Sequence, residues 1–166
     1  MNPVSAEELR AAFVNCSKSE AAKIIAPELE HLRWESLDFL AWRSARAPQR
    51  AYLVAPGEHG LVGVVMRAAQ SRNATGAVRS AMCEYCHVIH SAGGVTLFTA
   101  SKAGAAGRRG DSIGGYFCSD LNCSLYVRDL KRPTRVQPQT TMTVDERVDR
   151  LNLRLSGLIT NVLAQR

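Results

Sequence analysis

The chain has 166 residues, 46% of them hydrophobic, a composition typical of a folded globular protein rather than of a disordered segment. No apolar run approaches the roughly 20 residues that cross a bilayer, and no secretory signal pattern is present at the start, so we expect a cytoplasmic protein without a membrane partner. The net charge of +6 is modest, and because residues 1–40 carry seven acids against four bases, the basic surface belongs to the rest of the chain.

Helical signals fill the first forty residues. Ser5 and Glu8 have the spacing of a capping box, which predicts a helix over residues 6–15. A second short helix is predicted over residues 19–25, and the spacing of leucines predicts a third over residues 28–40. The large aromatic side chains of this region are assigned to the core; they are Trp34, Phe39 and Trp42.

After residue 50 the pattern changes to that of strands. Residues 51–54 and 61–66 are apolar and partly β-branched, and the Pro and Gly residues between them predict a β-hairpin with a loop of five to six residues. Residues 67–79 then turn polar, with three arginines and no acid. We expect this stretch to be a connection or an exposed rim.

Four cysteines form two close pairs, Cys83-x-x-Cys86 and Cys118-x4-Cys123, as a tetrahedral zinc site requires. One structural Zn²⁺ held by the four thiolates would join the two pairs across the segment between them. Disulfides are the alternative, but the lack of a secretory signal favours a reducing compartment, and a second pair argues against a thioredoxin-like redox motif. Cys16 lies in an apolar helical pattern and is predicted to be a small buried side chain.

Two histidines follow the first cysteine pair, and the step from Cys86 to His90 is also a feasible ligand spacing. His87 or His90 could therefore replace a cysteine as a ligand. With four thiols available, we expect both histidines to lie around the site or on the surface.

The order of elements around the cysteines predicts a treble-clef zinc finger over residues 80–135. The first pair lies on a turn, strands are expected at residues 95–99 and 113–117, and residues 103–110 form a flexible run between them. Cys118 is expected to open a helix, where free backbone N–H groups and the helix dipole favour a thiolate.

The final element is the clearest helix. Thr143 and Glu146 form a capping box, and an apolar stripe repeats every three or four residues as far as Val162. About two heptads are too few for a coiled coil, so we expect this helix to dock on the N-terminal helices of the same chain, in a monomer rather than a dimer. The predicted fold is α+β and one compact unit, in three segments: a helical part with a β-hairpin (1–79), the zinc finger (80–135) and the C-terminal helix (139–166).

Three stretches carry a resemblance to a known family, together with the x2 and x4 cysteine spacing. They are Phe13-Val14-Asn15-Cys16-Ser17-Lys18, Leu37-Asp38-Phe39-Leu40-Ala41-Trp42-Arg43 and Ala47-Pro48-Gln49-Arg50-Ala51-Tyr52. Over most of its length the chain resembles the elongation factor G-binding family with a C-terminal treble-clef zinc finger, the FusB type. The resemblance implies binding to translation elongation factor G, release of the factor from stalled ribosomes, and fusidic acid resistance. It implies partner binding and not catalysis.

The resemblance also implies site residues. The cysteines become the zinc ligands, Tyr85 takes the place of an aromatic residue of the factor-binding surface, and Arg108 and Arg109 are candidate basic contacts in a Gly/Ala-rich loop. The alternative for Tyr85 is packing over the metal site, and for the arginines a solvated loop. The chain departs from the resistance proteins, which are longer and have an N-terminal helical bundle, so we expect factor binding to be kept better than drug resistance.

A nucleic-acid-binding zinc protein is the second hypothesis, because basic residues that could line phosphates follow the finger helix. These residues are Arg128, Lys131, Arg132 and Arg135. Few aromatics lie among them, so a platform for stacking RNA bases is not evident. A zinc hydrolase or deaminase is disfavoured, since a catalytic zinc needs an open position and four thiolates close the shell. We therefore expect no enzyme activity.

Overall fold

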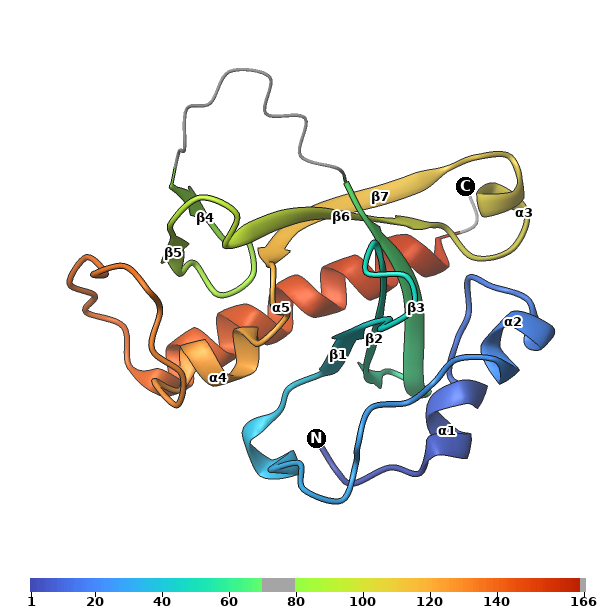
Figure 1. Cartoon of the computed structure of the whole chain (residues 1–166), viewed down its shortest axis with the longest axis horizontal. Coiled ribbons are helices and arrows are strands. Elements are labelled where there is room, and N and C mark those ends of the chain that lie inside the picture. Colours follow the sequence, from blue (N-terminus) through green and yellow to red (C-terminus); the bar gives the residue numbers. More distant parts are fainter. Residues whose placement is uncertain (70–79, 165–166) are drawn as a thin grey trace.

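A computed structural model describes residues 1–69 and 80–164, which form an antiparallel sheet with helices around it (Figure 1). The predicted α+β class is confirmed. The elements are, in chain order, α1 (Ala6–Ala11), α2 (Lys18–Ala22), a 3₁₀ turn (Trp34–Ser36), β1 (Leu40–Arg43), β2 (Arg50–Gly57), β3 (Gly60–Ala68), β4 (Ala81–Met82), β5 (Ile89–His90), β6 (Val95–Ser101), α3 (Gly104–Arg108), β7 (Ser112–Cys118), α4 (Cys123–Val127) and α5 (Val144–Leu163).

A five-stranded sheet in the order β1-β2-β3-β6-β7 runs through the molecule (Figure 1). β2 and β3 form the predicted hairpin, but the pairing continues to Gly57 opposite Gly60, so the turn is shorter than expected. β6 and β7 form a second hairpin that pairs along its full length, and β4 and β5 make a separate two-stranded piece. Through the β3–β6 pairing, this single sheet joins strands of the predicted first and second segments.

Both faces of β2 are buried, which places one core on each side of the sheet. Because successive side chains of a strand point to opposite faces, Leu53 belongs to one core while Tyr52 and Val54 belong to the other. The helices α1 and α2 cover the Tyr52 side, together with the segment that leads to β1. The larger core lies on the other side and includes all four paired cysteines and the apolar face of α5.

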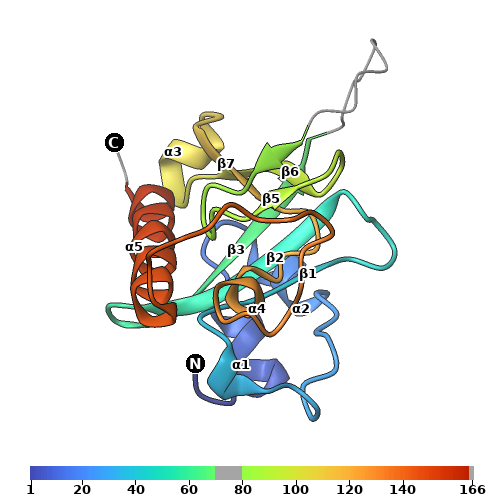
Figure 2. The same ribbon diagram turned by 90° about the vertical axis from the view of Figure 1, so that its left-hand side faces the viewer.

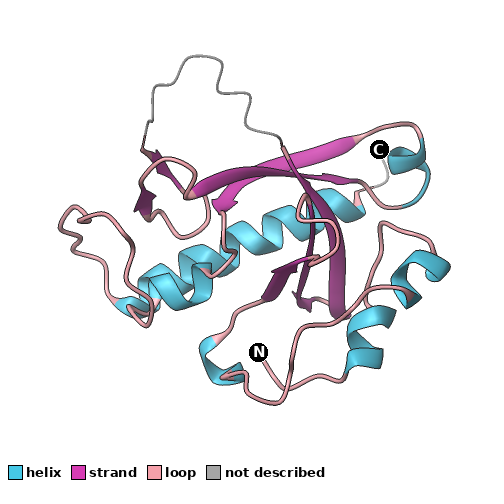
Figure 3. Ribbon diagram, in the orientation of Figure 1, coloured by secondary structure: helices cyan, strands magenta, loops and turns pink. Residues whose placement is uncertain are grey.

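The long helix α5 packs along the sheet and α4 (Figures 2 and 3). The predicted capping box is confirmed: Thr143 Oγ1 accepts from the Glu146 N–H, and Glu146 in turn accepts from the Thr143 N–H. The prediction that this helix docks on the N-terminal helices was wrong, since the main contacts of α5 are with α4, β7 and β2. The reason is the double-sided sheet, which gives α5 its own apolar face to cover. That buried stripe of α5 consists of Leu151, Leu155, Leu158, Ile159 and Val162.

The helix predicted over residues 28–40 does not form, apart from the 3₁₀ turn Trp34–Ser36. Leu40 instead starts β1 opposite Val54, where strand pairing satisfies its backbone groups and overrides the local helical spacing. The aromatic assignment holds for Phe39, which is buried, whereas Trp34 and Trp42 are only half-buried.

Three further boundaries differ from the sequence prediction. α1 ends at Ala11 because the next residues pair with β3, and α2 is shorter than predicted and is capped by Ser17. The run predicted as flexible contains the helix α3, where Gly107 is required because a Cβ there would lie 1.8 Å from the Lys102 carbonyl oxygen.

Cys16 is half-buried rather than fully buried. Of the predicted polar stretch, the first two residues form the end of β3, and 70–79 lie outside the described residues.

No helix in the described parts of the chain is both long and apolar enough to span a membrane.

Candidate metal centre

The four paired cysteines converge from three parts of the chain. Cys83 and Cys86 lie on the turn between β4 and β5, Cys118 ends β7, and Cys123 begins α4. All four are buried, and their sulfurs lie within 4.8 Å of one another. The Sγ atoms of Cys83 and Cys123 are 3.7 Å apart, and those of Cys86 and Cys118 are 3.3 Å apart.

This spacing fits one tetrahedral ion. With Zn–S bonds of about 2.3 Å, ligand sulfurs lie about 3.8 Å apart, close to the separations found here. All four thiols are free, so none is committed to a disulfide. The predicted ligand set, Cys83, Cys86, Cys118 and Cys123, therefore forms a buried site that suits a single structural zinc ion.

The first pair is shaped by a tight turn. The N–H of His87 donates to the Cys83 carbonyl, the N–H of Cys83 donates to Val88, and the N–H of Tyr85 points to the Cys83 sulfur at 3.4 Å. His87 has a φ of 60°, the left-handed conformation that closes such a turn and that a non-glycine residue adopts at some cost. The backbone of His87 thus helps to aim the cysteines, while its side chain is half-buried.

The second pair spans a chain reversal. Leu121 has a φ of 59° and donates its N–H to the Cys118 carbonyl, and α4 begins two residues later. Cys118 does not open the helix as predicted; Cys123 does, because the chain must first turn at Leu121. Cys123 lies in the first turn of α4, where backbone N–H groups lack helical partners and favour a thiolate.

The four buried thiols shift one another's pKa values. Hydrogen bonds from the thiols of Cys118, Cys123 and Cys86 lower the pKa of Cys83. The same set of contacts, together with burial, raises the pKa of Cys123. A bound divalent cation would displace the protons of the thiols.

The His90 side chain contacts one of the four sulfurs. Its Nε2 lies 3.2 Å from Cys118 Sγ, the residue is only 4% exposed, and its ring packs edge-on against Tyr126. This is a position around a four-sulfur site, as expected for His90. An N–H donated from Nε2 to the Cys118 thiolate would orient the ligand and stabilise its charge.

The sequence did not point to Arg150, which is on α5, sixty-four positions from the first pair. Its guanidinium approaches the Cys86 carbonyl oxygen at 3.5 Å, and its charge, after burial, lowers the pKa of His87. A cation beside four thiolates and one zinc ion offsets part of their net negative charge. No local motif signals this role, because it depends on the packing of α5 against the turn.

Tyr85 has a packing position. It is 6% exposed, and its ring stacks on Phe117 with the ring centroids 3.6 Å apart. Gly115 makes room for it, since a Cβ at residue 115 would lie 2.6 Å from the Tyr85 hydroxyl oxygen. Of the two alternatives weighed for Tyr85, this geometry is the one expected of a residue that packs beside the metal site.

Arg108 and Arg109 are exposed at the end of α3, and Arg109 lies 3.8 Å from Asp111. The helix α3 and the β4–β5 turn are at opposite ends of the β6–β7 hairpin (Figure 1). The structure therefore does not bring these arginines together with Tyr85.

The basic cluster after the finger is partly neutralised. Arg128 pairs with Asp38, and Lys131 lies 2.9 Å from Asp120. Arg132 is exposed and has no ion pair with the described residues, and Arg135 is in the same situation. Two free bases make a weak phosphate-binding surface, which lowers the support for nucleic-acid binding.

Comparison with known proteins gives one match. The sequence model of a family described as the FBP C-terminal treble-clef zinc-finger matches residues 8–162, a range that contains the whole sheet and the four cysteines. No curated protein and no solved structure matches the chain.

Proposed function

The chain belongs to the family of the FBP C-terminal treble-clef zinc-finger, as its sequence resemblance indicated, and on this basis we propose that it binds translation elongation factor G and promotes its release from stalled ribosomes. The observation that carries the proposal is the closed four-cysteine centre, which ties the β4–β5 turn, β7 and α4 into one rigid unit. A rigid unit of this kind can present a fixed surface to a partner protein. The site of action would be the cytoplasm, where the factor works.

Binding rather than catalysis is what the centre supports. Four buried sulfurs fill a tetrahedral shell and leave no position for a substrate or a water molecule. A zinc ion held by the four cysteines would stabilise the fold, with an apparent binding free energy of order 10 kcal/mol in small structural sites.

Arg108 and Arg109 are the proposed basic contacts, since both are exposed at the tip of the β6–β7 hairpin. Tyr85 lies at the other end of this hairpin, where it stacks on Phe117 beside the metal centre. The hairpin connects the two regions, because β7 ends at the metal ligand Cys118 and begins just after α3.

Release would be mechanical. A protein that binds the free conformation of the factor better than its ribosome-bound conformation shifts the equilibrium toward the free state, by no more than the difference between the two affinities. No chemical step is required.

The test is a pull-down of purified elongation factor G by the zinc-loaded protein, with RNA as competitor. We expect binding that resists RNA and that weakens in an Arg108→Glu, Arg109→Glu double variant, while the Arg132→Glu control binds normally. Sedimentation of ribosomes trapped with the factor and fusidic acid then measures release. If the factor is ignored and RNA is bound with a steep salt dependence, nucleic-acid binding replaces the proposal.

A further inference from the structure

β3 and β6 separate after only two paired positions. Their register joins Arg67 to Thr99 and Ala68 to Phe98, so the next pair on the same face would be Val65 with Ser101. These two residues are not paired. The strands diverge there, and further along β3 its free edge pairs instead with residues 12–14, through the parallel bridge between Phe13 and Gly63.

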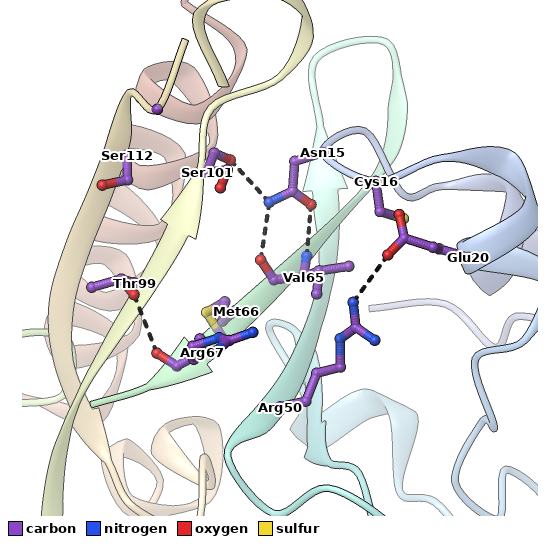
Figure 4. A pocket seen from close by; sticks show the side chains of 11 residues that line it. Asn15, Cys16, Glu20, Arg50, Val65, Met66, Arg67, Thr99, Ser101 and Ser112 are labelled. Atoms are coloured by element: carbon purple, nitrogen blue, oxygen red, sulfur yellow. Dashed lines mark hydrogen bonds and ion pairs between the residues drawn. The ribbon is translucent and has the colours of Figure 1, made fainter. Parts of the chain in front are cut away.

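The side chain of Asn15 fills the gap (Figure 4). Its Nδ2 donates to the carbonyl oxygens of Val65 and Ser101, both at 2.9 Å, and its Oδ1 accepts from the Val65 N–H at 2.8 Å. The amide thus replaces a strand neighbour on β3 and holds β6 at a fixed separation. The opening between the strands is therefore built into the fold.

Two adjoining pockets lie along this opening and share Asn15, Cys16 and Ser101; we call them the splay groove. Their volumes are about 440 and 510 Å³. Four basic side chains line the groove, and the one acid among the lining residues, Glu20, lies 3.2 Å from Arg50. These bases are Arg50, Arg67, Lys102 and Arg108.

The charge of the groove is not balanced by the fold. Neither Arg67 nor Lys102 has an ion pair among the described residues, and residues 70–79 contain no acid that could provide one. The lining also includes the hydroxyl-bearing residues Thr99, Ser101 and Ser112, beside the apolar Val65 and Met66. Such a surface offers hydrogen bonds to a polypeptide backbone and positive charge to carboxylates.

We propose that the splay groove binds an extended acidic segment of a partner protein. The proposal goes beyond factor binding through Arg108 and Arg109, because it assigns a second surface whose binding side chains are Arg67 and Lys102; Arg108 is the one residue that the two surfaces share. Carboxylates of the segment pair with Arg67 and Lys102, and its backbone lies along the hydroxyl groups of β6. A nucleic acid fits less well, since no aromatic side chain among the described residues lines either pocket for base stacking.

Cys16 offers a reporter at the centre of the groove, because it is the one cysteine outside the metal centre. Burial, and then the Glu20 carboxylate, raise the pKa of Cys16, so its alkylation by iodoacetamide is followed at alkaline pH. The zinc-loaded protein is titrated with a fluorescein-labelled peptide of alternating glutamate and serine. Fluorescence anisotropy reports binding, and mass spectrometry reports alkylation of Cys16.

We expect the peptide to slow alkylation of Cys16, and each of Arg67→Glu and Lys102→Glu to weaken binding about tenfold. Arg132→Glu removes an equal exposed charge outside the groove and should change affinity less than about twofold. Equal losses in all three variants would mean attraction to net charge alone and would overturn the proposal. Unchanged Cys16 alkylation at saturating peptide, or tighter binding of an RNA oligonucleotide that protects Cys16, would overturn it as well. Factor binding by the Arg67→Glu variant is measured in parallel, so that the two proposals fail independently.

Discussion

Asp38 and Arg128 form a two-point ion pair across ninety positions of sequence, with the Arg128 Nη atoms 2.5 and 3.0 Å from the two Asp38 carboxylate oxygens. The Asp38 side chain is 5% exposed and that of Arg128 is 20% exposed. The Asp38 N–H also donates to Ser124 Oγ. The pair fastens the segment before β1 to the end of α4, and so to the metal centre.

Removing one partner of this pair should be costly. Asp38→Ala leaves a largely buried guanidinium without its carboxylate, and we expect a loss of about 2–4 kcal/mol in the free energy of unfolding, measured by urea denaturation of the zinc-loaded protein. Glu28→Gln is the control, because Glu28 and His31 form an exposed pair worth little. A loss below about 0.5 kcal/mol in Asp38→Ala, the scale of exposed pairs, would show that the pair does not fasten the two segments.

The metal ligands could be predicted from sequence because their identity depends on local spacing. Two cysteines a few positions apart can share one ion whatever the rest of the chain does. Capping boxes are equally local, which is why those at Ser5 and Thr143 were found.

Other features depend on distant partners. Leu40 pairs with Val54 and becomes strand despite its leucine spacing, and Arg128 was assigned to a phosphate surface because its partner Asp38 lies ninety positions earlier. The packing position of α5 likewise depends on a sheet with two apolar faces, and no single segment of sequence reveals such a sheet.

The zinc content of cysteine variants should distinguish the four metal ligands from the fifth cysteine, Cys16. We expect one zinc ion per chain by elemental analysis, retained in Cys16→Ser and lost in Cys118→Ser together with much of the stability. Acid should also release the zinc, because protons compete for the thiolates as the pH falls. A folded Cys118→Ser protein with a full complement of zinc would remove Cys118 from the ligand set.

Asn15 should stabilise the fold through its amide group. Asn15→Leu has a similar size but leaves the Val65 N–H and carbonyl without partners, and we expect a loss of about 2–4 kcal/mol on chemical denaturation. Hydrogen exchange at the Val65 amide should become faster at the same time. Asn161→Ala, which removes an exposed side-chain bond to Gly157, is the matched control and should change little. Unchanged exchange at Val65 in Asn15→Leu would contradict the bridging role.

His90 should slow the loss of zinc. His90→Phe keeps a ring against Tyr126 but removes the nitrogen that lies 3.2 Å from Cys118 Sγ. We expect zinc transfer to a chromogenic chelator to become roughly 10-fold faster, within the range seen for the partners of metal ligands. His31→Gln, on an exposed side chain, should leave the rate unchanged. If His90 were itself a ligand, His90→Phe would lower the zinc content and not only the rate.

Tyr85 offers a direct choice between packing and partner contact. Because the residue is 6% exposed and its ring stacks on Phe117, Tyr85→Phe should leave the free energy of unfolding nearly unchanged and the proposed affinity for elongation factor G within about twofold. Tyr85→Ala should destabilise the protein by about 3–5 kcal/mol, since it leaves a cavity beside the metal centre. Denaturation and the factor pull-down are measured on the same preparations. A Tyr85→Phe protein of normal stability that no longer binds the factor would assign the hydroxyl to the partner surface, and the role of Tyr85 would then be contact rather than packing.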